Sequence, residues 1–230
     1  MKTLVLDLDE TLVHSSFKPH PGRQADLLVP MLIDKIECKV HVLVRPGAQQ
    51  FCETLAKSYE IVVFTASLAK YAEPLIAMLD KNKTWCSHIL VREHCTYHEK
   101  SDAYVKDLGR LGRDLKDVII IDNSPSCYIL NKENALASRT WFSDVRDREL
   151  YEFIPILKKL ARVEDVRPYL SKIGKEASVK VGEDIHVNSR KALTIVDGLL
   201  GEQFYQYTEA IVDRKRRNVS TLPETLEEFN

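Results

Sequence analysis

Among the runs of consecutive apolar residues in the first 125 positions, four stand apart from any longer periodic pattern, at residues 4–6, 61–64, 89–91 and 118–121. They do not alternate with polar residues, which is typical of strands buried on both faces. Helical spacing of apolar residues marks 46–59, 68–79 and 150–160, with Pro74 predicting a bend or break in the second of these. Trp141-Phe142 is expected to be a strand before the last helix. This alternation predicts an α/β fold with a Rossmann-like parallel sheet covered on both faces.

The stretch between residues 13 and 44 has a different pattern. Residues 13–17 leave the sheet, and Pro19 and Pro21-Gly22 keep the following segment irregular. Two β-rich runs at 27–33 and 38–44 then flank the polar pair Asp34-Lys35, and the second run alternates apolar and polar residues. We expect a β-hairpin with one face toward water, inserted beside the strand ends.

The character of the chain changes after about residue 168. Residues 174–184 are polar and are expected to form a linker or a loop. Residues 188–212 show the apolar spacing of an amphipathic helix, with Gly198 and Gly201 as weak points. The predicted division is a globular domain at 1–168 and a partly helical C-terminal extension at 169–230.

Composition narrows the class of protein. The 230 residues are 44% apolar and 29% charged, as in soluble globular domains, and the formal net charge is −1. Nothing in the overall charge favours nucleic acid or a membrane surface, and no apolar run approaches the ~20 residues needed for a membrane span. The five cysteines are scattered without metal-ligand spacing, which indicates reduced thiols in a nuclear or cytoplasmic protein.

Two carboxylates follow the first buried run at alternate positions. Asp7 and Asp9 would leave the strand on the same face, where their mutual repulsion invites a divalent cation. One of them can then act as a nucleophile while the other carries protons. Thr65, Asp122 and Asn123 also follow strands, at the sheet edge where α/β proteins bind ligands. The alternatives are solvated acids at a strand end and an Asp-Asn turn.

These motifs resemble the haloacid dehalogenase superfamily. Within it, the chain is similar to the small phosphatases that act on the RNA polymerase II C-terminal domain, of the NLI-interacting-factor-like and Dullard-like type. The resemblance covers residues 3–168 and rests on Asp-Leu-Asp-Glu-Thr-Leu-Val-His-Ser-Ser at 7–16, Phe-Thr-Ala-Ser-Leu-Ala-Lys-Tyr at 64–71, Tyr-Val-Lys-Asp-Leu at 104–108, Gly-Arg-Asp-Leu at 112–115, Ile-Asp-Asn-Ser-Pro at 121–125 and Trp-Phe-Ser-Asp at 141–144.

The resemblance implies four catalytic residues. Asp7 is expected to attack phosphorus and form an aspartyl-phosphate, and Asp9 to protonate the leaving oxygen and later deprotonate water. Thr65 and the backbone amides after it would bind phosphoryl oxygens at a helix start, although Thr65 or Ser67 could instead be an N-cap. Lys106 would balance the phosphoryl charge.

The same resemblance implies Mg²⁺ as the cofactor. Its expected ligands are the side chains of Asp7 and Asn123, the backbone carbonyl of Asp9, and Asp122 directly or through water. Carboxylate and amide oxygens with retained waters are the donors that Mg²⁺ prefers.

The resemblance places substrate binding largely on the hairpin and the second helix. Arg92 is a candidate for a second phosphate or the peptide backbone, with a surface ion pair to Glu93 as the alternative. Met31 is larger than the branched residue usual in the family, which predicts a reshaped pocket. The pocket residues carried over are Phe17, Met31, Ile33, Val40, Leu68 and Tyr71, any of which could instead be core.

The resulting functional prediction is a magnesium-dependent serine/threonine protein phosphatase. Its expected partner is a phosphorylated protein with phosphoserine–proline sites, such as the RNA polymerase II C-terminal domain, without direct nucleic-acid contact. A small-metabolite phosphatase is the first alternative, but the stretches after Asp9 and Thr65 are short for a cap domain. The second alternative is an inactive scaffold that binds partners through the C-terminal amphipathic segment.

Overall fold

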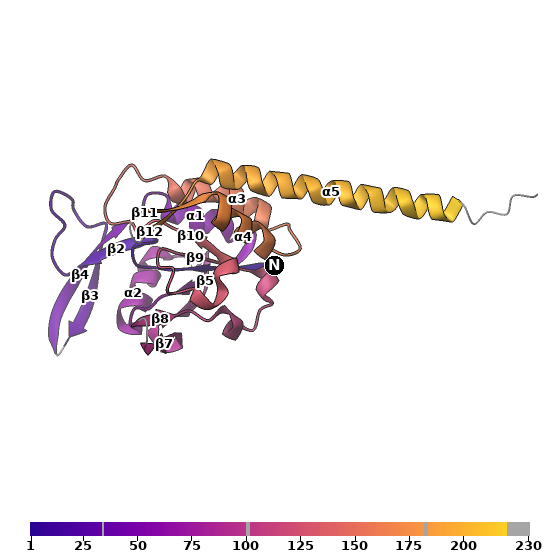
Figure 1. The fold of residues 1–230 in the computed structure, drawn as a ribbon. Helices are drawn as coiled ribbons and strands as arrows, with labels where there is room; N and C mark the ends of the chain where they lie inside the picture. Colours follow the sequence, from indigo (N-terminus) through magenta and orange to yellow (C-terminus); the bar gives the residue numbers. More distant parts are fainter. Residues whose placement is uncertain (34, 100–101, 182–183, 220–230) are drawn as a thin grey trace, which may run out of the picture.

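The first apolar run forms the middle strand of a five-stranded parallel sheet in the computed structural model (Figure 1). The structure describes residues 1–33, 35–99, 102–181 and 184–219. Neighbouring strands of this sheet all run parallel, which confirms the predicted fold class. In spatial order the strands are β10 (Ala135–Ala137), β9 (Val118–Asp122), β1 (Lys2–Leu6), β5 (Tyr59–Phe64) and β6 (Cys86–Leu90).

The fifth strand differs from the prediction. The expected strand at Trp141-Phe142 is wrong, because β10 ends at Ala137 and these two aromatics lie in the loop beyond it. The Trp141 amide donates to the carbonyl of Glu10, which ties that loop to the segment after β1. The strand β10 is only three residues of alanine and leucine, so it lacks the β-branched signal that identified the others.

Successive residues of β1 point to opposite faces of the sheet, so Leu4 and Leu6 enter one core and Val5 enters another. The larger core receives α1 (Ala48–Leu55), α2 (Ala69–Leu79) and α3 (Glu149–Leu160). The smaller core is closed by short 3₁₀ segments, η3 (Leu108–Leu111) and η4 (Leu115–Asp117), together with Tyr128. Both faces are therefore covered, but the second is covered by turns rather than helices.

The helix boundaries refine two predictions. Helix α1 is shorter than the predicted 46–59, because Gly47 precedes it with a left-handed φ of 85° and Tyr59 already belongs to β5. Helix α2 continues through Pro74 to Leu79, so of the predicted bend or break at this residue the break is wrong. Two further 3₁₀ segments are η1 (Arg92–His94) and η5 (Ile129–Asn134).

The predicted hairpin is present, as part of a three-stranded antiparallel sheet at one end of the molecule (Figure 1). Strands β3 (Leu27–Ile33) and β4 (Ile36–Val44) pair with each other, and β2 (Val13–Ser16) pairs with the other edge of β4. Residues 13–16 thus leave the central sheet, as expected, but immediately enter this second one. A small hairpin of β7 (Thr96–His98) and β8 (Ala103–Val105) precedes Lys106.

The expected linker at 174–184 is wrong for the residues that the structure describes. They end α4 (Arg167–Glu176), form β11 (Ser178–Val181) and begin β12 (Asp184–Val187), while Gly182 and Glu183 lie outside the description. Tyr169, Ile173 and Val196 are buried in the same core as Leu4. The predicted amphipathic helix is α5 (Ser189–Val219), which runs beyond the edge of the domain in Figure 1.

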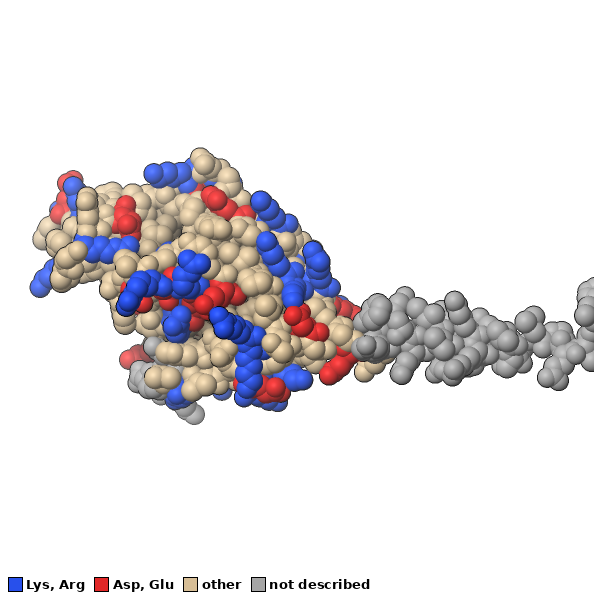
Figure 2. Space-filling model, turned by 90° about the horizontal axis from the view of Figure 1, so that it is seen from above, with Lys and Arg blue, Asp and Glu red and all other residues tan. Residues whose placement is uncertain are grey.

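The distribution of charged side chains on the surface and the hydropathy of the described helices agree with the near-zero net charge and the modest apolar content of the sequence. Lys and Arg side chains are interspersed with Asp and Glu side chains over the face seen in Figure 2. Among the described residues, no helix combines the length and apolar character that a membrane crossing requires.

Asp80 links the end of α2 to the start of β6, and it provides a test of the fold. Its buried carboxylate accepts hydrogen bonds from the backbone amides of Thr84, Trp85 and Cys86 at 2.7, 3.1 and 2.9 Å. Burial alone would raise the pKa of Asp80, but these hydrogen bonds outweigh it and lower the pKa below the ordinary value. The carboxylate therefore stabilises the fold above the unfolded-state pKa and loses this effect as pH falls through its folded-state pKa.

We expect Asp80→Asn to lower the free energy of unfolding by about 1.5–3 kcal/mol at pH 7, because the amide NH₂ cannot accept backbone N–H groups. Urea denaturation at decreasing pH should show the difference from wild type shrinking below pH 4. The matched control is Asp114→Asn, an exposed cap that accepts from one backbone amide. Equal stability of Asp80→Asn and wild type at pH 7 would contradict this account.

Candidate active site

The segment after β1 turns back on itself and separates the two predicted carboxylates. The Asp7 amide still pairs with the carbonyl of Ile121 in β9, so Asp7 remains fixed to the sheet. Glu10 then adopts a left-handed φ of 57°, and Leu12 and Val13 both donate backbone hydrogen bonds to Leu8. Asp7 thus faces the sheet edge, whereas Asp9 faces the cavity beside α2.

Asp7 lies in a buried cluster of opposite charges. The Lys106 ammonium donates to Asp7 Oδ1 and to Asp122 Oδ2, both at 2.6 Å. Lys106 is fully buried, and its backbone amide is held by the carbonyl of Cys127. Burial works to lower the pKa of Lys106, but the charges of Asp122 and Asp7 outweigh it and raise the pKa, so the ammonium form persists. The structure therefore brings together three of the predicted residues, with the ammonium group of Lys106 between the carboxylates of Asp7 and Asp122.

Asp9 has a different environment. Its carboxylate accepts from the Tyr71 hydroxyl at 2.7 Å, from the Ser67 hydroxyl at 2.8 Å and, at 3.4 Å, from the Thr65 hydroxyl. Burial raises the pKa of Asp9 and the charge of Asp7 adds to this, while the hydrogen bonds from Tyr71 and Ser67 oppose it. The net raised pKa favours the protonated carboxyl that a general acid needs.

The segment at 65–68 contains an internal hydrogen bond. The Thr65 hydroxyl accepts the Ser67 amide at 3.0 Å, so this amide is already used. Helix α2 has Leu68 as its N-cap residue, and no side-chain cap bond is made, so the N-cap alternative for Thr65 or Ser67 is wrong. Ser67 instead contacts Asp9. Sequence reasoning missed this role, although the position of Ser67 within the matched motif was a usable signal.

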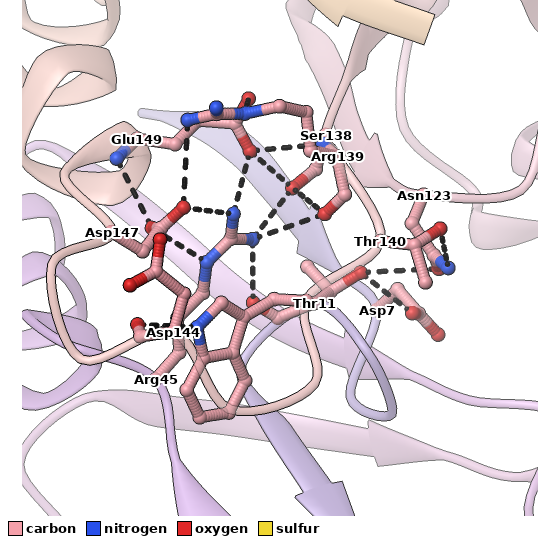
Figure 3. Close-up of polar contacts among 11 residues, drawn as sticks. Asp7, Thr11, Arg45, Asn123, Ser138, Arg139, Thr140, Asp144, Asp147 and Glu149 are labelled. Carbon is pink, nitrogen blue, oxygen red and sulfur yellow. Dashed lines mark hydrogen bonds and ion pairs between the residues drawn. The ribbon is translucent and has the colours of Figure 1, made fainter. Parts of the chain in front are cut away.

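The side-chain oxygen atoms suit the predicted cation. Asn123 donates its amide to the Thr140 hydroxyl at 3.1 Å, which leaves its oxygen on the side of Asp7, as Figure 3 shows. Thr11 donates to Asp7 Oδ2 at 2.8 Å and lies 3.4 Å from that Asn123 oxygen. Within the described residues, no three His, Cys, Asp or Glu side chains form a metal cage. Two carboxylates, one amide and a backbone carbonyl fit Mg²⁺, which keeps several waters.

A cavity of about 320 Å³ opens beside Asp9. It is mostly apolar in lining and lies between the hairpin sheet and the start of α2. Ser15, Ser16 and Ser67 also line it and were not predicted. The side chain of Ile33 lies outside the described residues. The predicted pocket residues found in the lining are Phe17, Met31, Val40, Leu68, Tyr71 and Arg92.

Arg92 is held at the rim of this cavity. Its Nε donates to the carbonyl of Ala66 at 2.6 Å, and its guanidinium lies 4.9 Å from the ring centroid of Tyr104. Among the ion pairs of the described residues, none joins Arg92 to Glu93. The side chain is therefore stacked and oriented toward the cavity rather than paired along the surface.

Two of the cysteines are poorly suited to act as nucleophiles. All five are free thiols. Burial raises the pKa of Cys127, the thiol nearest to Asp122 in sequence, to about 11, and burial likewise raises the pKa of Cys86 to about 11. These thiols are protonated at neutral pH and therefore poorly reactive.

Removing the buried ammonium tests the charge cluster. We expect Lys106→Met to lower the free energy of unfolding by about 3–5 kcal/mol without divalent cations, because Asp7 and Asp122 are left together without a counter-charge. The measurement is urea denaturation in the presence of a chelator. Lys158→Met, on an exposed position of α3, should change stability by less than about 0.5 kcal/mol. Similar stabilities for the two variants would contradict the proposed charge balance.

Comparison with solved structures supports the fold. The structure of the fission yeast RNA polymerase II CTD phosphatase Fcp1 bound to beryllium fluoride matches with a TM-score of 0.53 and 17% identity, covering 93% of this chain and 66% of that chain. A second structure of Fcp1, described as an essential RNA polymerase II CTD phosphatase, matches with a TM-score of 0.54 and 18% identity, covering 93% and 65% of the respective chains. At this identity the likeness concerns the fold alone.

Sequence relatives are much closer. A probable C-terminal domain small phosphatase of Dictyostelium discoideum is 52% identical over 167 residues, covering 73% of this chain and 53% of the relative. The human carboxy-terminal domain RNA polymerase II polypeptide A small phosphatase 1 is 47% identical over 163 residues, covering 71% and 60%. The chain thus spans little more than half the length of these relatives. Residues 2–167 match the NLI interacting factor-like phosphatase family, and the chain belongs to this family.

Proposed function

We propose that the chain is a magnesium-dependent serine/threonine protein phosphatase that works through an aspartyl-phosphate on Asp7. The observation that carries this proposal is that two carboxylates following the same strand have unlike surroundings. Asp7 is held by Lys106 and Thr11, whereas Asp9 is held by neutral hydroxyl groups at the wall of an open cavity. Carboxylates in such different surroundings can take the separate roles of nucleophile and acid.

In the first step, a carboxylate oxygen of Asp7 attacks phosphorus, and the bond from phosphorus to the serine or threonine oxygen breaks. Asp9 gives its proton to that leaving oxygen, which departs as a hydroxyl group. The Lys106 ammonium, 2.6 Å from Asp7, balances negative charge as the phosphoryl group is transferred. The hydrogen bond from Thr11 fixes the carboxylate of Asp7 for the attack.

In the second step, water attacks phosphorus and the bond from phosphorus to Asp7 breaks. Asp9, now a carboxylate, takes the proton from the water, so inorganic phosphate leaves and both aspartates return to their starting forms. Hydrogen bonds from Tyr71 and Ser67 stabilise the carboxylate form of Asp9 between the two steps.

Asp7, Asp122, Asn123 and the backbone carbonyl of Asp9 would hold the Mg²⁺ ion. When bound there, the cation supplies positive charge that neutralises the phosphoryl oxygens and suppresses the repulsion between them and Asp7. The orientation of Asn123, fixed through Thr140, supports this assignment because it offers an oxygen rather than an NH₂ group.

The form of the cavity supports a peptide substrate. It is open, and its apolar wall beside Asp9 suits a proline or another apolar residue next to phosphoserine. Arg92, at its rim, suits a peptide carbonyl or a second phosphate. Several relatives are named carboxy-terminal domain RNA polymerase II polypeptide A small phosphatases. Phosphoserine–proline peptides of that type are therefore the first candidates, in a nuclear or cytoplasmic setting.

Replacing the nucleophile provides the main test. With Mg²⁺ present, we expect wild type to release phosphate from phosphoserine–proline peptides in preference to phosphotyrosine peptides and sugar phosphates. Asp7→Asn should reduce turnover at least about 1,000-fold, because the amide is a poor nucleophile, and a chelator should abolish wild-type turnover. Asp114→Asn serves as the surface control. Preference for sugar phosphates would reject the protein-substrate assignment, and absence of any turnover by a folded wild-type protein would reject the enzyme.

The acid role of Asp9 can be separated from the nucleophile's role by the choice of leaving group. Asp9→Asn should reduce turnover of a phosphoserine peptide by about 100- to 10,000-fold, since a serine alkoxide needs a proton to leave. With p-nitrophenyl phosphate, whose leaving group needs no proton, the same variant should release about one equivalent of nitrophenol rapidly and then turn over slowly. Stopped-flow absorbance measures this burst. An equal loss on both substrates, without a burst, would argue against Asp9 as the acid and base.

A further inference from the structure

Arg45 is a fully buried arginine outside the set of residues assigned so far. All five of its N–H groups have acceptors (Figure 3). Nε and Nη2 donate to the two carboxylate oxygens of Asp147 at 2.9 and 3.1 Å, and Nη2 also donates to Glu149 at 2.9 Å. Nη1 donates to the Thr11 carbonyl at 3.1 Å and to the Ser138 hydroxyl at 2.9 Å.

The cluster around Arg45 is neutral overall. Asp147 and Glu149 carry two negative charges, and Arg45 and Arg139 carry two positive charges, since Arg139 Nε donates to Glu149 at 3.0 Å. The Ser138 hydroxyl and the Arg139 amide also donate to Glu149, at 2.8 and 2.9 Å. Such a buried cluster is stable only when every member is satisfied, so its geometry is fixed.

One arm of this cluster leads to the nucleophile. The guanidinium of Arg45 donates to the backbone carbonyl of Thr11, and the backbone amide of Arg45 donates to the carbonyl of Leu12 at 3.0 Å. The hydroxyl of the same Thr11 donates to Asp7 Oδ2 at 2.8 Å. Thr11 is therefore the single residue between the guanidinium and the carboxylate that attacks phosphorus.

The second arm leads to the amide ligand proposed for the cation. Arg45 Nη1 binds the Ser138 hydroxyl and lies 3.4 Å from the Arg139 carbonyl, at the start of the loop 138–141. The Ser138 amide donates to the carbonyl of Asp122, and Thr140 accepts the Asn123 amide. The loop that Arg45 holds therefore fixes the side chain of Asn123.

We propose that Arg45 is a positioning residue for catalysis, because its guanidinium sets Asp7 through Thr11 and Asn123 through the loop 138–141. This inference rests on the proposed phosphatase function. Only a guanidinium has five N–H donors in a fixed plane, and here they reach acceptors on α3, on the loop after β10 and on the segment after β1. A lysine would retain the charge but could not hold the three segments in one arrangement.

Arg45→Lys tests the proposal because it retains the charge. In variants that remain folded by circular dichroism, we expect kcat for a phosphoserine peptide to fall by about 10- to 100-fold, as for a small misplacement of reacting groups. KM should remain within about threefold of wild type, because Arg45 is not among the residues that line the cavity. Calorimetry without substrate should show weaker Mg²⁺ binding, by about 10-fold, as for loss of an outer-shell partner.

A double-mutant cycle separates positioning from a general loss of stability. Thr11→Val removes the hydroxyl that holds Asp7, so Arg45→Lys should then act on kcat only through the loop 138–141, and its effect should be smaller than in wild type. Arg113→Lys is the matched control, because Arg113 also binds one carboxylate, that of Glu60, through two N–H groups but contacts neither active-site arm. It should leave kcat and Mg²⁺ affinity at wild-type values.

Ser138→Ala keeps the proposal testable if Arg45→Lys does not fold. It removes an acceptor of Arg45 without changing any charge, and we expect kcat to fall severalfold at unchanged KM. Wild-type kcat and Mg²⁺ affinity in folded Arg45→Lys, or in Ser138→Ala when Arg45→Lys is unfolded, would overturn the positioning role. Fully additive losses in the cycle would also overturn it. A wild-type protein inactive on every phosphomonoester would instead overturn the proposed function itself.

Discussion

The site depends on the cost of placing two carboxylates together away from water. Asp7 and Asp122 come from the ends of adjacent strands, β1 and β9, and their repulsion would expel one of them if nothing positive lay between them. The ammonium of Lys106 occupies that place, at 2.6 Å from each. The parallel sheet, the small hairpin before Lys106 and the turn after β1 together bring these three charges to one point. The carboxylate of Asp7, to which we assign the role of nucleophile, is thereby held in place by an opposite charge.

Asp9 lies two positions after Asp7, but its carboxyl group has different surroundings and therefore different acid–base properties. It has no cationic partner among the described residues and is surrounded by the hydroxyl groups of Thr65, Ser67 and Tyr71. Neutral donors stabilise a carboxylate less than an ammonium does, and burial therefore dominates its pKa. The turn with the left-handed Glu10 creates this difference, because it directs the two carboxylates toward separate environments.

Sequence reasoning predicted the parts of the site that lie at strand ends. Asp7, Thr65 and Asp122 directly follow apolar runs, and the position of an apolar run identifies the sheet edge. The cluster of Arg45 with Asp147 and Glu149 was not predicted. The two acidic residues lie 102 and 104 positions after Arg45 in the sequence, and each of the three residues, taken alone, resembles a surface charge. The strand β10 and the packing of α4 were missed for a related reason. The sequence of β10 is short and that of α4 is largely polar, so neither shows a clear apolar pattern. Their structure depends on tertiary packing, through the burial of Leu136 in β10 and of Ile173 in α4.

The position of Tyr71 has a consequence for how substrate range can diverge in this fold. Its ring belongs to the cavity wall, and its hydroxyl belongs to the hydrogen-bond set of Asp9. A substitution at this position that altered the shape of the cavity would therefore also disturb the proton transfer that we propose for Asp9. Met31 and Val40, on the hairpin strands, touch the same cavity, and their aliphatic side chains donate no hydrogen bond to either aspartate. New specificities are thus most accessible to mutation on the hairpin, while the first turns of α2 stay constrained by the chemistry.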